Sequence, residues 1–252
     1  MLADLLLEGA VTRIEGPLLF AQRAARVGLN SAVAVSGGDN VARLGRVAAL
    51  DEQSMVIEVL QSTAGLGLAG TRVRLRAEPL LFGVGPNLLG RIFDSVGRPI
   101  DGGPSVAARA RMRIEGLAIN PSWRALPRDF IETGVSTIDL LNSLVRGQKL
   151  PLFSAGGLPH DRLATQIAQR ARLRGGSSEE FAVVFAGMGV PHDTAEQFRA
   201  AMESSGALGH TVLFLNLADE PGMQRLLTPR YALTAAEYLA FVEGRHVLVI
   251  LT

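Results

Sequence analysis

Residues 150–162 combine features that bind phosphate groups in many nucleotide-binding proteins. A short apolar stretch at 150–154 is followed by a glycine-containing turn at 155–159 and by a helical pattern that begins near His160. A turn of this kind, placed between a strand and the start of a helix, presents backbone N–H groups that can cradle phosphates. The segment therefore has the layout of a phosphate-binding P-loop.

The residues that give a P-loop its chemistry are absent from this segment. The pattern G-x-x-x-x-G-K-[ST] finds Ala155 and His160 at its two glycine positions, Asp161 at the lysine position and Arg162 at the Ser/Thr position. The Asp161 carboxylate stands where a triphosphate needs a cation, and Arg162 offers no oxygen ligand to Mg²⁺. We therefore predict a degenerate P-loop without catalytic residues. It consists of Ser154, Ala155, Gly156, Gly157, Leu158, Pro159, His160, Asp161 and Arg162.

The tripeptide Pro-His-Asp occurs at 159–161 and again at 191–193, each time after an expected strand. A functional interpretation places His160, Asp161, His192 and Asp193 at one sheet edge as metal ligands. The alternative function is then a stand-alone degenerate P-loop hydrolase with a His/Asp metal site. A structural interpretation has each tripeptide start a helix, with Pro setting φ and Asp at the positive end of the helix dipole. We favour the structural interpretation and predict no metal site, because a metal needs a defined third ligand and none is evident.

The elements that must position these residues alternate between apolar strands and helices. Continuous apolar strands alternating with helices are typical of a parallel sheet covered on both faces. No helix follows the last strand, so we expect a fragment whose α/β domain is incomplete. The expected strands are 150–154, 181–186, 211–215 and 246–251, and the expected helices are 160–173, 193–204 and 229–243, the last opened by Pro229.

The first part of the chain has a different character. Its short β-branched segments are broken by glycine and show no helical period, which predicts an all-β barrel domain at 1–78. Residues 79–148 contain six prolines and are expected to form an irregular linker and edge region. Residues 79–252 would then comprise the linker and the incomplete α/β domain. The expected strands of the first domain are 11–14, 32–35, 41–50, 55–60 and 72–76.

Composition excludes several classes of protein. With 48% hydrophobic residues, 19% charged residues and a net charge of +1, the chain suits neither a disordered segment nor a general nucleic-acid binder. The absence of cysteine excludes disulfides and thiolate metal sites. Trp123 is expected to serve packing or an interface rather than base stacking. No apolar run approaches a membrane span and the first residues lack a basic signal region, so we expect a soluble, cytoplasmic chain.

Several longer motifs carry a family resemblance. Thr-Gly-Val-Ser-Thr-Ile-Asp at 133–139, Leu-Val-Arg-Gly-Gln-Lys-Leu-Pro-Leu-Phe-Ser at 144–154 and Gly-Leu-Pro at 157–159 resemble the non-catalytic, regulatory B subunit of V-type and A-type ATPases and ATP synthases, truncated at its C-terminus. The resemblance covers nearly the whole chain, and the Gly-Leu-Pro loop is specific to this kind of subunit. Supporting stretches lie at 89–93, 97–102, 181–189, 212–216, 227–230 and 235–241.

This resemblance implies an N-terminal β-barrel followed by a RecA-like nucleotide domain. It implies that copies of this chain alternate with catalytic A subunits in a hexameric ring that contacts stalk subunits. This ring would belong to a soluble head peripheral to the membrane. The complex would couple ATP synthesis or hydrolysis to proton or sodium transport, without nucleic acid and without membrane insertion of this chain. ATP or ADP with Mg²⁺ would lie at the interface with the catalytic subunit, next to the degenerate loop, and this chain would bind none tightly.

The resemblance also bears on the general base. In catalytic relatives a Glu that polarises the attacking water follows the strand matching 185–189. This chain has Val190 at that position, and a valine side chain neither accepts nor relays a proton. The resemblance therefore implies a subunit that is not itself an enzyme.

Overall fold

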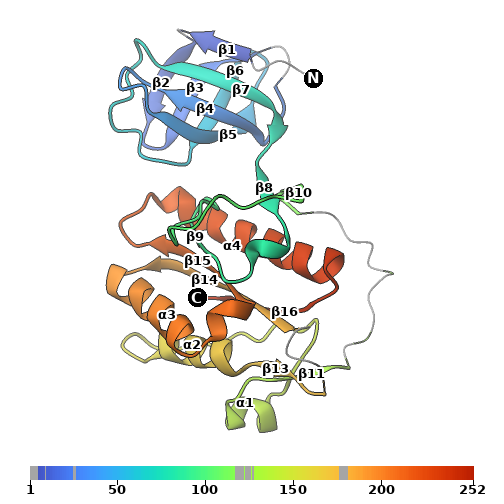
Figure 1. Cartoon of the computed structure of the whole chain (residues 1–252). Coiled ribbons are helices and arrows are strands. Elements are labelled where there is room, and N and C mark those ends of the chain that lie inside the picture. Colours follow the sequence, from blue (N-terminus) through green and yellow to red (C-terminus); the bar gives the residue numbers. More distant parts are fainter. Residues whose placement is uncertain are drawn as a thin grey trace. The chain divides into compact units, whose positions relative to one another are not determined.

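The computed structural model describes residues 5–8, 10–24, 27–116, 122, 126, 128–175 and 181–252. Trp123 lies outside these residues. The chain divides into two compact units, one formed by 1–81 with 220–226 and the other by 82–219 with 227–252. Each unit has its own sheet (Figure 1).

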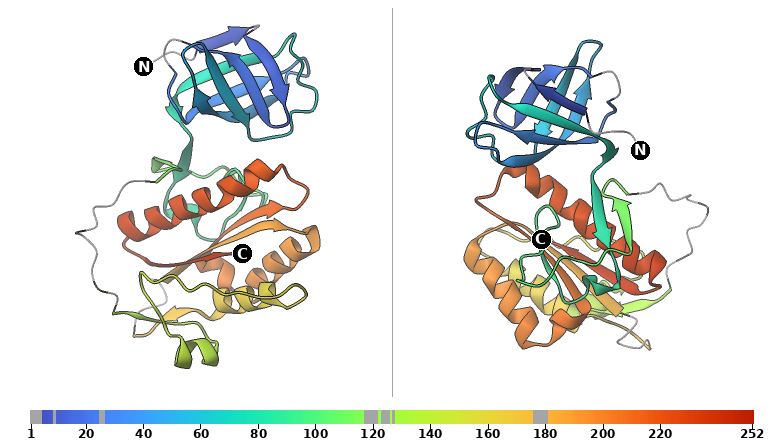
Figure 2. Two further views of the ribbon diagram at one scale, coloured as in Figure 1. Left: turned by 180° about the vertical axis from the view of Figure 1, so that it is seen from behind. Right: turned by 45° about the horizontal axis from the view of Figure 1, so that its top comes forward.

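The first unit is built on one antiparallel sheet of seven strands, in the order β1-β7-β4-β5-β6-β3-β2. Figures 1 and 2 show this sheet curled into a barrel-like form. In β7 the arginines at 72, 74 and 76 are exposed while Val73 and Leu75 are buried, which is the alternation expected of a strand with one wet face. The strands are β1 (Leu5–Glu8), β2 (Val11–Glu15), β3 (Leu18–Gln22), β4 (Ser31–Ser36), β5 (Ala42–Leu50), β6 (Ser54–Val59) and β7 (Arg72–Pro79).

Every strand expected in this part of the chain is present, and two more were missed. β1 and β3 are short and lack a clear alternation of buried and polar residues in the sequence. The inward side chains form an apolar core, because each strand turns its β-branched or long apolar residues to the same side. Its fully buried members include Leu19, Val33, Val35, Val47, Met55, Ile57, Val59 and Val73.

The second unit contains a parallel sheet of four strands in the order β16-β14-β15-β9. Helices cover both faces, α2 and α3 on one and α4, which belongs to this unit from Leu227 onward, on the other (Figures 1 and 2). The sequence-based prediction of a parallel sheet with helices on both faces is confirmed. The strands are β9 (Ile92–Asp94), β14 (Phe181–Val190), β15 (Thr211–Leu217) and β16 (His246–Leu251), and the helices are α2 (His160–Arg170), α3 (His192–Ser204), α4 (Gly222–Glu237) and the π-helical turn η5 (Tyr238–Val242).

Residues 79–148, expected to form an irregular linker and edge region, contribute one edge of the parallel sheet, because β9 pairs with β15. Residues flanked by prolines can still pair when a neighbouring strand offers free backbone groups. The remaining elements of this stretch are β8 (Leu81–Val84), η1 (Pro86–Leu88), β10 (Ala110–Arg113), β11 (Phe130–Glu132), α1 (Ser136–Leu141) and β12 (Leu144–Val145). β11 lies between β12 and β13 (Arg172–Leu173) in a small three-stranded sheet.

Two sequence-based predictions are wrong. Residues 150–154 form no strand: among the described residues no strand pairs with them, Pro151 has no N–H to donate, and Phe153 is 95% exposed. Pro229 does not open its helix but lies inside α4. The neighbouring Leu227 and Thr228 are buried, so their packing holds the helix where proline removes one backbone hydrogen bond.

Candidate functional site

The predicted phosphate loop is an exposed irregular segment that leads into α2. Its turn is closed by the Leu158 N–H, which donates to the Ala155 carbonyl at 3.3 Å. Gly157 has φ +83°, a left-handed conformation that glycine adopts without strain. The His160 N–H donates to the Leu158 carbonyl at 2.9 Å, and α2 begins at this histidine. The segment therefore supplies a turn and a helix start, without the preceding strand that the sequence-based prediction placed at 150–154.

Asp161 lies in the first turn of α2, where the helix dipole favours a negative group. One of its carboxylate oxygens, Oδ1, accepts a hydrogen bond from the Thr252 hydroxyl at 3.2 Å. The other, Oδ2, lies 3.7 Å from Nε2 of His160. The side chain of Asp161 thus supplies the anion at the helix start. The neighbouring Arg162 is exposed to solvent.

Thr252 is brought to this place by the parallel sheet. Its N–H donates to the Ala186 carbonyl at 3.0 Å, and its carbonyl accepts from the Met188 N–H at 2.8 Å. These bonds continue the pairing of β16 with β14 by one residue. The carboxyl edge of the sheet therefore lies beside the start of α2, which is where open α/β sheets bind ligands.

Val190 ends β14 and its side chain is buried in the core between the sheet and α3. The chain bulges between Met188 and Val190, and Gly189 has φ +71°. The bulge lets the Gly189 N–H bond the side-chain oxygen of Asn216 at 3.0 Å. Asn216 is fully buried and was missed by sequence reasoning; a lone amide near the end of an apolar strand was the available signal. The edge holds a buried amide and a valine, neither of which serves as a general base.

The four residues of the alternative metal site do not converge. His192 pairs instead with Asp219, at 3.2 Å between Nε2 and Oδ2, and this hydrogen bond lowers the pKa of the Asp219 carboxyl. In the part of the chain that the structure describes, no three His, Cys, Asp or Glu side chains gather in a way that could hold a metal ion. α2 and α3 begin at His160 and His192, as the structural interpretation of the repeated tripeptide predicts.

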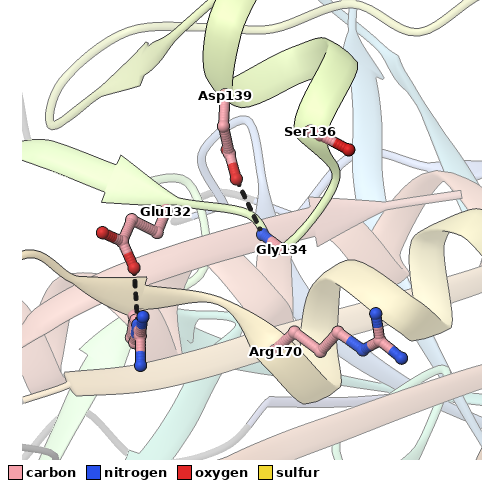
Figure 3. Close-up of a pocket in the computed structure, with 6 residues that line it drawn as sticks. Glu132, Gly134, Ser136, Asp139 and Arg170 are labelled. Atoms are coloured by element: carbon pink, nitrogen blue, oxygen red, sulfur yellow. Dashed lines mark hydrogen bonds and ion pairs between the residues drawn. The ribbon is translucent and has the colours of Figure 1, made fainter.

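Two open cavities lie near these elements. One, of about 360 Å³, lies between α2 and α3, and Asp161 and Arg162 line one end of it. The other, of about 510 Å³, lies beside β11 and α1 (Figure 3). Its two acids are already engaged: Glu132 bonds Arg172 at 2.6 Å, and Asp139 accepts the Gly134 N–H at 3.1 Å. Arg162 at the first cavity is the one loop residue that offers an exposed cation.

None of the helices that the structure describes combines the length and the apolar character needed to cross a membrane.

Comparison with known proteins places these features in context. Residues 134–252 match the nucleotide-binding domain of the ATP synthase alpha/beta family. Relatives that are 49% identical over 242 residues include the A-type ATP synthase B subunits of Methanospirillum hungatei and Aeropyrum pernix and the V-type ATP synthase beta chain of Halothermothrix orenii. Each match covers 96% of this chain and 52% of the relative. The chain therefore spans about half the length of the curated relatives it matches.

Proposed function

Because this chain belongs to the family of A-type and V-type ATP synthase B subunits, we propose that it acts as the non-catalytic, regulatory B subunit of a rotary ATPase. In this proposal the chain alternates with catalytic A subunits in a hexameric ring and contacts the stalk. The ring belongs to the water-exposed head of the complex, peripheral to the membrane. It couples ATP synthesis or hydrolysis to the transport of protons or sodium ions.

The observation that carries the non-catalytic role is the carboxylate at the start of α2. A functional P-loop offers this helix end to the phosphates and adds a lysine. Here Asp161 lies in that turn and its carboxylate is bonded to Thr252. A bound phosphate would meet a negative group at the position where it needs a positive one. These residues do not fit Mg-ATP, so we derive no chemical step at this loop.

The chain would instead contribute one wall of a site whose chemistry the catalytic neighbour performs. Residues 154–162 are exposed over their whole length apart from the half-buried Asp161. Exposed loops at the carboxyl edge of a parallel sheet are suited to contact a ligand held mainly by another surface. ATP or ADP with Mg²⁺ would then lie at the interface between neighbours in the ring. Val190 supports a wall of the site that takes no part in the chemistry, because its buried apolar side chain cannot activate water.

Nucleotide binding tests this proposal directly. Calorimetry with Mg-ATP should give no micromolar binding to the chain. The double variant Asp161→Lys/Arg162→Thr, which supplies the missing cation and hydroxyl, should show no ATPase activity because Val190 provides no base. Micromolar binding by the parent chain, or robust turnover by the double variant, would contradict the proposal.

Association tests the second half of the proposal. The chain should bind a catalytic A subunit in native mass spectrometry. A matched control is the unrelated nucleotide-binding protein adenylate kinase, which should not bind. Zinc-dependent hydrolysis by the chain alone, lost on His192→Ala, would support the alternative hydrolase and contradict our assignment.

A further inference from the structure

The last turn of the helix before β16 holds one residue more than an α-helix allows. The Glu243 N–H donates to the Tyr238 carbonyl five residues earlier, at 3.2 Å, whereas α-helical bonds span four. The next bond runs from the Arg245 N–H to the Leu239 carbonyl six residues earlier, at 2.9 Å. Gly244 has φ +69° and lets the chain leave the helix. The turn η5 therefore stores an extra residue just before the strand begins.

A side-chain hydrogen bond spans the same five residues as the backbone bond. The Tyr238 hydroxyl donates to Oε1 of Glu243 at 2.6 Å. The Tyr238 ring is 1% exposed, so its packing anchors the donor, and the Glu243 side chain is 20% exposed. Arg109 approaches the same carboxylate only to 3.7 Å, from a side chain that is largely exposed. The tyrosine is therefore the closer and better buried partner of Glu243.

The extra residue in η5 matters because the apolar pattern of β16 does not by itself fix the register in which this strand pairs with β14. The strand pairs in parallel with β14, from Phe181 opposite His246 to Ala186 opposite Leu251. Leu248 and Ile250 pack against the core that α2 and α3 cover, while Val247 and Val249 alternate with them. Both faces are thus apolar. A slip by one residue would exchange them with little loss of apolar burial, so the register depends on polar contacts and on turn geometry. One such contact joins Arg146 to Nδ1 of His246 at 2.8 Å, and the turn η5 is the other constraint at this end of the strand.

We propose that Tyr238 and Glu243 form a positioning pair that locks the extra residue into η5 and so sets the register of β16. The consequence reaches the other end of the strand. In the present register the Thr252 hydroxyl lies on Asp161. If the turn relaxed to an α-helical one, each position of β16 would receive the preceding residue, and Leu251 would replace Thr252 beside α2. This inference stands whether or not the proposed function holds.

Disulfide trapping can test the register, because the chain has no cysteine of its own. The pair Asp161→Cys/Thr252→Cys reports the register seen here, and Asp161→Cys/Leu251→Cys reports a slip by one residue. Each pair is combined with Tyr238→Phe, Glu243→Leu, Glu243→Gln or Arg109→Gln. Far-UV circular dichroism checks that each protein is folded.

Tyr238→Phe, which keeps the ring, and Glu243→Leu should each lower trapping of the 161/252 pair about fivefold and raise trapping of the 161/251 pair, since one hydrogen bond no longer holds the turn. Glu243→Gln keeps an acceptor oxygen and should restore the parent pattern. Arg109→Gln should match the parent. Unchanged trapping in Tyr238→Phe, an equal loss of both pairs, or the same shift in Arg109→Gln would overturn the proposal.

Discussion

The carboxylate of Asp101 holds β9 at the edge of the parallel sheet, and replacing it with asparagine should weaken the second unit. Asp101 accepts both arms of the Arg91 guanidinium, at 2.5 Å from Nε and 2.9 Å from Nη2. It also accepts the Ile92 N–H at 3.1 Å and the Gly103 N–H at 2.9 Å. Four donors therefore converge on one side chain. Three of them belong to Ile92, the first residue of β9, and to Arg91, which precedes it.

The expected loss follows from this arrangement. Both partners of the pair are only about one-seventh exposed, at 15% for Arg91 and 14% for Asp101. Breaking a fully buried pair costs about 3–5 kcal/mol, and an exposed pair contributes less than about 1 kcal/mol. In Asp101→Asn one oxygen still accepts, but the amide N–H₂ faces donors. We expect a loss of about 3 kcal/mol in the free energy of unfolding, measured by urea denaturation followed by circular dichroism.

The pH dependence supplies a second measurement. The Arg91 guanidinium holds the pKa of Asp101 well below the ordinary value of 3.8. A carboxyl whose pKa is lowered by folding adds stability above its unfolded pKa and loses it as the pH falls towards the folded pKa. The difference between the parent chain and Asp101→Asn should therefore be constant above about pH 5 and shrink below about pH 4.

A double-mutant cycle with Arg91→Gln separates the pair from the backbone contacts. We expect a coupling energy of about 1–3 kcal/mol between the two side chains. A loss below about 1 kcal/mol in Asp101→Asn would place the pair among weak surface ion pairs and refute the reasoning. A deficit that does not shrink on acidification would refute the assignment of the lowered pKa.

Three further outcomes are expected. Gly97→Ala should destabilise the protein by about 2 kcal/mol in thermal unfolding, because φ is +76° and a Cβ would lie 2.8 Å from the buried ring of Tyr231. The control Gly102→Ala, where φ is +72° and a Cβ would meet no atom within 4 Å, should cost only about 1 kcal/mol. Equal losses would contradict this. Phe198→Ala should cost about 3 kcal/mol in urea, since its ring is 2% exposed and packs on another aromatic ring; a loss under about 1 kcal/mol would mean that the core refills. The hydrogen bond from Arg43 is the main reason that the pKa of Asp39 is about 2. Arg43→Leu should raise this pKa towards its ordinary value, as measured by NMR titration. An unchanged pKa would mean that the hydrogen bond from the Val41 N–H causes the shift instead.

The local sequence was enough to predict helices and strands whose contacts lie close in the sequence, or whose apolar residues repeat with a single period. The alternation in β7 and the apolar run that becomes β14 predicted strands, because one or both faces had to be buried. The two Pro-His-Asp tripeptides predicted the helices that begin at His160 and His192, because Pro sets φ before each helix and Asp favours the positive end of its dipole. Residue types alone also show that positions 161 and 162 carry Asp and Arg, where the P-loop pattern has Lys and Ser or Thr.

Only the tertiary structure decided which of the strand-like segments are strands. Residues 150–154 have an apolar pattern but stay unpaired among the described residues, while β9, between prolines and glycines, joins the sheet. Pairing needs free N–H and C=O groups on a neighbour, and the strand that pairs with β9 is β15, far along the chain. The same reason applies to the contact of Thr252 with Asp161, which depends on the register of β16. Residue types set what each position can do, and long-range hydrogen bonding decided where each position lies.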